Sequence, residues 1–379
     1  MNELHVIPDG AVLIRDGVIL EVGPSRRLEN LAAAKGADEI DACGRVVMPA
    51  FVDSHTHLAV PLTPGDDEEI AHRVRGLSGQ RIEARTRSFV DAMARHGTAT
   101  VEAKTGTGAD ECAEYKLLRV FSALQEEGPL DVVPSLLCKL PHTGADAALD
   151  HFAGELLPRV SRRKAAVFAD IACNGEGEHI PCYERYLASA SQLGFRRKVH
   201  AGSPQVSAAI ELAIRHSATS IDHLEYATPE DARRIAAAGI VATVFPISCF
   251  QNRGSQPPVR ELIAAGAPVA IATNFNPYSP TLNMQTAIAL AALHFGMTME
   301  QAISAATING AHALGRGDRI GSIEPGKSAD LIVLNVHDYR ELRESLGTNL
   351  VQQTMKKGSI IYREGQINRA SGLPGRPSQ

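Results

Sequence analysis

The chain has 379 residues, of which 44% are hydrophobic and 21% charged, and its formal net charge is −5. This length fits one (β/α)8 barrel of about 250 residues with a smaller module beside it, and the composition excludes a disordered chain. There is no basic surplus, no secretion signal at the N-terminus and no run of about 18 apolar residues, which argues against nucleic acid and membranes as partners. We therefore expect a cytoplasmic protein that acts on a small molecule.

The first 46 residues are expected to be rich in β-structure. Short alternating apolar runs at residues 11–15 and 18–22 flank the pair Asp16-Gly17. Such a pair between alternating runs is a strong signal for a two-residue hairpin turn. We predict that residues 1–46 form part of a small β-domain.

The next segment alternates short apolar runs with amphipathic stretches, the rhythm of βαβ units in a parallel sheet. The runs are rich in Val, Ile and Ala without strict alternation, which is typical of strands covered on both faces. Eight runs qualify, at residues 47–57, 98–104, 132–138, 167–173, 198–201, 220–225, 241–246 and 269–273. Eight units close a barrel, whereas a doubly wound sheet usually stops at about six strands, and no GxGxxG or P-loop motif is present. Residues 47–321 are therefore predicted to form a (β/α)8 barrel.

Residues 322–365 return to the style of the N-terminal segment, with apolar runs at 330–336 and 359–363. Two β-rich ends that flank a barrel are expected to meet, so residues 1–46 and 322–365 are predicted to form one composite β-sandwich. The Pro-, Gly- and Ser-containing residues 366–379 are expected to form a mobile tail.

The active site of a (β/α)8 barrel lies at the C-terminal ends of its strands, so histidines in those positions are candidate site residues. The first run ends in His55 and His57, which share one face of a strand because residues i and i+2 do. The fifth and sixth runs end in His200 and His223. A lone histidine is more often structural, but a His-X-His pair joined by histidines from other strands predicts one divalent metal ion, Zn or Fe.

Other polar residues end the same strands and belong to the same candidate site. They are Asp53, Glu102, Lys104, Asp222, Glu225 and Asn274. The carboxylates either orient the ligating imidazoles or take a direct part in the chemistry, and the sequence leaves both possibilities open.

The segments VVMPAFVDSHTHL (46–58) and IGSIEPGKSADLIVL (320–334) resemble signatures of the amidohydrolase superfamily. Within that superfamily VEAKTGTG, IDHLEYAT and TNFNPYSPTLNMQ are most similar to imidazolonepropionases, which open the imidazolone ring in histidine degradation. The likeness covers nearly the whole chain. It implies that His55, His57, His200 and the residue at position 274 bind the metal. It also implies that His223 lies close to the metal and contacts the substrate or the attacking water.

The chain departs from imidazolonepropionases at several site positions. Asn274 stands where the family has an aspartate that is both ligand and proton acceptor; an amide still offers Oδ1 to a metal but cannot accept the proton. It is either the natural residue or a deliberate replacement made to trap a ligand. Ser203 replaces a glutamate, Thr107 a tyrosine and Leu140 roughly a histidine, and no propionate-binding arginine occurs in residues 58–69. These combined losses predict a substrate other than imidazolonepropionate.

The expected substrate is a small heterocycle, and we also expect a homodimer. The candidate catalytic residues are His223 and Asn274. The positions expected to contact the substrate are Lys104, Thr107, Lys139, Ser203, His223 and Asn276, with Arg73, Arg75 and Arg81 as further cations able to replace the missing arginine.

The preferred reaction is hydrolytic opening of a cyclic amide related to imidazolone or hydantoin, with water activated by the metal and His223 polarising the developing oxyanion. Deamination of an amino-substituted heterocycle is an alternative, although Ser203 counts against it because deaminases usually place a glutamate proton shuttle near strand five. A metal- or ligand-binding homologue without catalysis is a third possibility, which Asn274 and Ser203 leave open.

Overall fold

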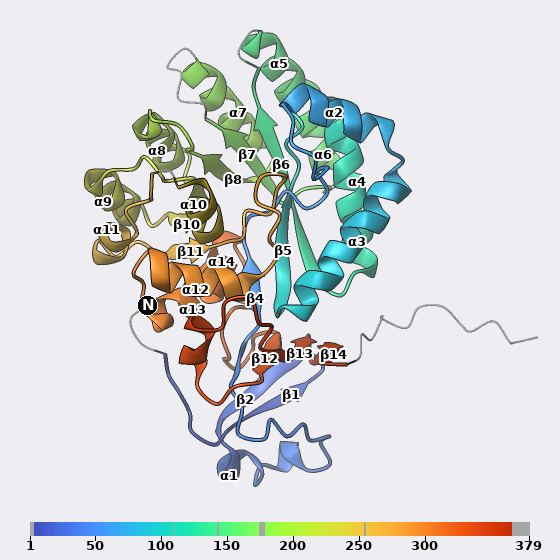
Figure 1. Ribbon diagram of the computed structural model, residues 1–379. Coiled ribbons are helices and arrows are strands. Elements are labelled where there is room, and N and C mark those ends of the chain that lie inside the picture. Colours follow the sequence, from blue (N-terminus) through green and yellow to red (C-terminus); the bar gives the residue numbers. More distant parts are fainter. Residues whose placement is uncertain (1–3, 109, 142–143, 174–178, 254, 366–379) are drawn as a thin grey trace, which may run out of the picture.

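The computed structural model describes residues 4–365 except 109, 142–143, 174–178 and 254. Its largest sheet has eight parallel strands that follow one another in chain order (Figure 1). They are β4 (Phe51–Asp53), β5 (Thr98–Lys104), β6 (Asp131–Lys139), β7 (Phe168–Ala172), β8 (Arg196–His200), β9 (Ser220–Asp222), β10 (Val241–Val244) and β11 (Val269–Ile271). A parallel bridge between Thr56 and Phe275 joins the two edges of the sheet, beyond the ends of β4 and β11. The sheet is thus a nearly closed barrel, which confirms the predicted (β/α)8 fold.

Helices cover the outside of the barrel, as the alternating sequence pattern predicts (Figure 1). They are α2 (Asp67–Gly76), α3 (Gly79–Arg95), α4 (Glu111–Glu127), α5 (Ala145–His151), α6 (Leu157–Arg162), α7 (Ile180–Gln192), α8 (Val206–Arg215), α9 (Pro229–Ala238), α10 (Pro246–Asn252), α11 (Val259–Ala264), α12 (Met284–His294), α13 (Met299–Ala306) and α14 (Ile308–Ala313). The ends of α9 show how local sequence sets these bounds. Thr228 and Asp231 form a capping box at its start, and Gly239, with φ of 67°, ends it in the left-handed conformation.

Two small antiparallel sheets come from the chain ends. β1 (Gly10–Arg15) and β2 (Val18–Pro24) pair across Asp16 and Gly17, whose φ values of 53° and 78° are those of the predicted hairpin turn. The second sheet contains β3 (Val47–Pro49), β12 (Leu331–Leu334), β13 (Val351–Lys356) and β14 (Ser359–Arg363). β13 is not predictable from its sequence, VQQTMK, which contains no run of apolar residues.

The residues predicted as the first barrel strand, 47–57, are divided between two sheets. β3 pairs with β12 in the four-stranded sheet, whereas β4 pairs with β5 in the barrel. The chain changes sheets at Pro49 and Ala50, and proline at the end of a strand suits such a break because it donates no ladder hydrogen bond. The proposed division into residues 1–46 with 322–365 and 47–321 stays a prediction, and residues 366–379 lie outside the described residues.

The four-stranded sheet packs against the N-terminal end of the barrel. Lys356 Nζ on β13 lies 2.9 Å from Asp131 and 3.3 Å from the Thr100 hydroxyl, at the beginnings of β6 and β5. The two small sheets lie together below the barrel in Figure 1. The opposite end, where the strands terminate, is therefore left to the site residues. Among the described residues, no helix is long and apolar enough to cross a bilayer.

Candidate active site

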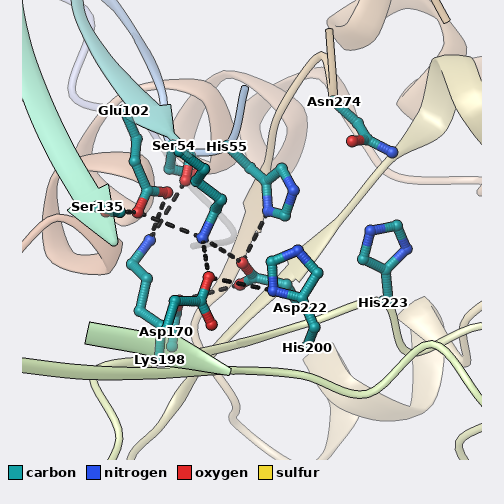
Figure 2. A network of polar contacts seen from close by, with 12 residues as sticks. Ser54, His55, Glu102, Ser135, Asp170, Lys198, His200, Asp222, His223 and Asn274 are labelled. Atoms are coloured by element: carbon teal, nitrogen blue, oxygen red, sulfur yellow. Dashed lines mark hydrogen bonds and ion pairs between the residues drawn. The ribbon is translucent and has the colours of Figure 1, made fainter. Parts of the chain in front are cut away.

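Three histidines gather at the C-terminal ends of the barrel strands. His55 follows β4, His200 is the last residue of β8 and His223 follows β9. One ligand nitrogen from each lies within 4.8 Å of those of the other two, and the His55 and His200 ring centroids are 4.7 Å apart. Figure 2 shows these three rings around one space, with Asn274 beside it. The tertiary structure thus brings together three of the four histidines expected at the site.

His57 lies next to this group but is not part of it. Its ring centroid is 5.4 Å from that of His55 and 6.4 Å from that of His200, and its Nδ1 is 3.2 Å from the Thr105 carbonyl oxygen. The histidines whose ligand atoms come closest are therefore His55, His200 and His223. The ligand set of His55, His57 and His200 with Asn274 stays a prediction.

A carboxylate lies behind each of the three clustered rings. Asp222 Oδ2 hydrogen-bonds His55 Nδ1 at 2.7 Å, and Asp170 Oδ2 lies 3.1 Å from His200 Nδ1. Glu225 Oε1 lies 3.4 Å from His223 Nδ1. A carboxylate at Nδ1 sets the tautomer of a histidine and leaves Nε2 as the atom available to a metal.

Four buried polar atoms in the cluster have no hydrogen-bond partner among the described residues. They are His55 Nε2, both ring nitrogens of His200 and Asn274 Oδ1. His200 Nδ1 lies 3.1 Å from Asp170 Oδ2 as an ion-pair contact. Buried polar atoms are rarely left without a partner, since each costs about 1–3 kcal/mol. The Asn274 amide nitrogen donates to Ser248 Oγ at 3.2 Å. This hydrogen bond identifies the nitrogen of the amide, and Oδ1 is the amide atom without a partner. Two imidazole nitrogens and an amide oxygen are a donor set that fits a divalent transition-metal ion.

The protonation states of the cluster suit a cation. Burial lowers the pKa of His55 well below its ordinary value and also lowers the pKa of His200. Burial by itself would raise the pKa of both aspartates, but Lys104 together with the other neighbouring cations and imidazoles outweighs it, so that the pKa of Asp222 falls well below its usual range and that of Asp170 to about 2. Neutral imidazoles backed by ionised carboxylates are the form in which histidines bind metal.

Below the histidines lies a network of charged side chains with no exposed surface. Lys104 Nζ is 2.5 Å from Asp170, 3.2 Å from Asp222 and 3.3 Å from Glu102. Lys198 Nζ is 2.7 Å from Glu102. Sequence reasoning assigned no role to Asp170 or Lys198. A charged residue within an otherwise apolar strand, as in FADIA of β7, is the signal that would have found Asp170.

Three predicted substrate contacts have their polar groups engaged within the protein. The Thr107 hydroxyl donates to Glu114 at 2.7 Å. Ser203 Oγ accepts the backbone N–H two residues later at 3.2 Å. Asn276 Oδ1 accepts the Tyr278 N–H at 2.7 Å, and its amide nitrogen donates to a backbone carbonyl at 2.7 Å. Their contact with a substrate stays a prediction.

Most cations expected at the entrance also have partners. Lys139 Nζ at the end of β6 lies 2.8 Å from Asp67 Oδ1 at the start of α2. Arg75 pairs with Asp110, and Arg73 donates to the carbonyl oxygens of residues 63 and 64 at 2.8 and 3.1 Å. Arg81 is an exposed residue of α3. The predicted substrate contact Lys104 is fully buried in the network beneath the histidines.

Comparisons with known proteins agree with this architecture. A model of the amidohydrolase family matches residues 46–361. Imidazolonepropionase of Geobacillus thermodenitrificans is 35% identical over 97% of this chain and 93% of its own length, and that of Porphyromonas gingivalis is 35% identical over 96% and 92%. Among solved structures, 5-methylcytosine deaminase from Klebsiella pneumoniae aligns with a TM-score of 0.75 at 18% identity over 96% of both chains. Adenosine deaminase from Xanthomonas campestris, with bound zinc, aligns with a TM-score of 0.71 at 20% identity over 96% of this chain and 90% of its own. The chain therefore belongs to the amidohydrolase family of hydrolases, and it is similar over almost its whole length to imidazolonepropionases.

Proposed function

We propose that this enzyme hydrolyses a ring C–N bond of a cyclic amide, imidazolone- or hydantoin-like, and that its substrate differs from imidazolonepropionate. The observation that carries the proposal is the 35% identity to an imidazolonepropionase over 97% of the chain. The histidine cluster at the strand ends supports it, because it lies where enzymes with this barrel hold their reactive groups.

One divalent ion, Zn or Fe, is the proposed cofactor. His55, His57 and His200 would hold it together with Asn274 Oδ1, and the buried acceptor atoms without partners support three of these four positions. When bound, such an ion supplies Lewis acidity, which makes water nucleophilic near neutral pH and polarises a carbonyl.

His223 is the proposed acid–base residue. It is a quarter exposed, it borders the same space as His55 and His200, and Glu225 lies 3.4 Å behind its Nδ1. Its Nε2 would take the proton of the attacking water, donate it in a hydrogen bond to the developing oxyanion, and then pass it to the leaving nitrogen. Asn274 contributes an oxygen and a fixed orientation but takes no proton, since an amide is not a base at neutral pH.

The charges at the entrance support a substrate without a carboxylate. A site that recognises a carboxylate needs a cation free to bind it. Lys139, Arg73 and Arg75 have partners within the protein, and Lys104 is buried. A neutral ring substituent is therefore the better match.

The test is a comparison of cyclic amides at matched metal content, with free imidazolones, hydantoins and imidazolonepropionate as substrates. Ring-opened product supports the proposal, provided that kcat/KM for imidazolonepropionate stays below about 10⁴ M⁻¹s⁻¹, the lower end of ordinary enzymes. Release of ammonia without ring opening would assign deamination instead, and metal binding without turnover on any substrate would assign a binding role. The cytoplasmic location and the homodimer stay predictions.

A further inference from the structure

A single ammonium group contacts two of the carboxylates that hold the clustered histidines. Lys104 Nζ is 2.5 Å from Asp170 Oδ2 and 3.2 Å from Asp222 Oδ2. The same Asp170 oxygen lies 3.1 Å from His200 Nδ1, and the same Asp222 oxygen lies 2.7 Å from His55 Nδ1. Figure 2 shows the contact of Asp222 with His55 and that of Asp170 with His200 as dashed lines. Each shared oxygen therefore lies between an imidazole Nδ1 and the same lysine.

This contact spans the interior of the barrel. Lys104 ends β5, Asp170 belongs to β7 and Asp222 ends β9, so three strands that are not neighbours meet at one side chain. All three side chains are fully buried. An interaction across the barrel interior fixes the relative positions of strands that are not adjacent. The hydrogen bonds between adjacent strands do not do this directly.

The two aspartates need a cation between them. Carboxylate oxygens of Asp170 and Asp222 lie within 4.8 Å of each other, as part of a group that also includes a ring nitrogen of His200. Like charges at this separation in a buried site repel strongly, because little water screens them. The Lys104 ammonium compensates this repulsion, so both carboxylates can keep their places behind the histidines.

We propose that Lys104 is a positioning residue that holds His55 and His200 as one preformed chelating pair through Asp170 and Asp222. The inference rests on the metal site of the proposed function. In this role Lys104 contacts neither the metal nor the attacking water. It acts through the two aspartates, which set the direction in which each Nε2 points.

Lys198 provides a matched control. It is a second lysine of the barrel interior without exposed surface, and its Nζ lies 2.7 Å from Glu102 Oε2 and 3.3 Å from the Ser54 carbonyl oxygen. Its hydrogen bonds and ion pairs among the described residues do not include Asp170 or Asp222. Replacing either lysine removes one buried positive charge, but only Lys104 contacts the carboxylates behind the two histidines.

The experiment compares Lys104→Met and Lys198→Met as purified full-length proteins. Zn²⁺ affinity is measured by competition with a chromogenic chelator, the visible spectrum of the Co²⁺-loaded protein reports ligand geometry, and thermal unfolding of the metal-free forms reports stability. We expect both variants to lose stability. Lys104→Met should lower Zn²⁺ affinity by about 10- to 100-fold and change the Co²⁺ spectrum, as loss of support behind metal-binding histidines typically does. Lys198→Met should stay within about 3-fold of wild type, since it leaves those supports in place.

A second variant covers the case in which Lys104→Met does not fold. Lys104→Met combined with Asp170→Asn removes one charge of each sign, which preserves the net charge of the network. It should bind Zn²⁺ about 10-fold more weakly than Asp170→Asn alone, because Asp222 also loses its lysine contact, and equal affinity of these two variants would overturn the inference. Wild-type affinity in the folded Lys104 variant, or an equal loss in Lys198→Met, would overturn the inference while leaving the proposed function intact. A wild-type protein that binds no metal overturns both. A wild-type protein that binds metal but opens no ring overturns only the proposed function.

Discussion

Replacing Asp67 with asparagine should free Lys139 to bind a substrate carboxylate. The two side chains form an ion pair at 2.8 Å and are 47% and 26% exposed, respectively. Lys139 lies close to the loop after β5, since a Cβ added to Gly106 would be 3.5 Å from Lys139 Cε. It also lies near the histidines: burial is the largest cause that lowers the pKa of His57, and the charge of Lys139 is the second. In Asp67→Asn the ammonium keeps its place but loses the competing anion.

The size of the effect follows from the chemistry of the new contact. A hydrogen bond to a charged group contributes about 1.5–3 kcal/mol, and the partial exposure of Lys139 reduces this to about 1–2 kcal/mol. That free energy corresponds to an increase of about 5- to 30-fold in kcat/KM. The gain should diminish at high salt, because screening weakens an exposed interaction.

The assay compares two cyclic amides that differ only in a side-chain carboxylate or carboxamide. The ratio of their kcat/KM values should shift toward the carboxylate by about 5- to 30-fold in Asp67→Asn. Glu21→Gln serves as the control, because it removes a similar acidic partner, 2.7 Å from Arg27, on β2 of the small hairpin. An unchanged ratio in Asp67→Asn, or the same shift in Glu21→Gln, would refute the reasoning.

Three further predictions concern the metal, the proton path and acid stability. The isolated protein should contain about one transition-metal ion per chain, and His200→Ala should lose it; elemental analysis that finds no metal even after reconstitution with Zn²⁺, Fe²⁺ or Mn²⁺ would contradict the site. Asn274→Asp should raise turnover by about 10²- to 10⁴-fold, which is the contribution of one positioned acid–base group, whereas His223→Ala should abolish turnover. Equal rates for wild type and both variants at matched metal content would show that neither residue handles the proton. Burial by itself would raise the pKa of Asp131, but Lys356, Lys357 and Arg316 together outweigh it and the net shift of the pKa is downward. The contribution of the ionised Asp131 to the free energy of unfolding should therefore be complete above pH about 4 and lost as the pH falls further. Urea unfolding at a series of pH values should show that wild type loses more stability in acid than Asp131→Asn. Parallel plots of unfolding free energy against pH for the two proteins would contradict this prediction.

Local sequence was sufficient for the elements and for part of the site. Apolar runs marked all eight barrel strands because buried parallel strands need apolar side chains on both faces, and Asp16-Gly17 marked the hairpin because both residues adopt positive φ there. The sequence also marked His55, His200 and His223, which the structure brings together, whereas His57 lies beside them and its role as a ligand stays a prediction. None of these inferences depends on how distant segments meet.

Tertiary structure decided which charged groups support the site. The contact of Lys104 with Asp170 and Asp222 joins residues separated by 66 and 118 positions, on strands that face each other only after the barrel closes. The pairing of Lys139 with Asp67 likewise depends on where α2 lies over the entrance. Apolar burial patterns predict which elements form, because each element has its own periodicity, but the partner of a single charge is set by closure of the whole barrel. The sequence by itself therefore determined the barrel and its histidines, and the folded chain determined which charges hold them in place.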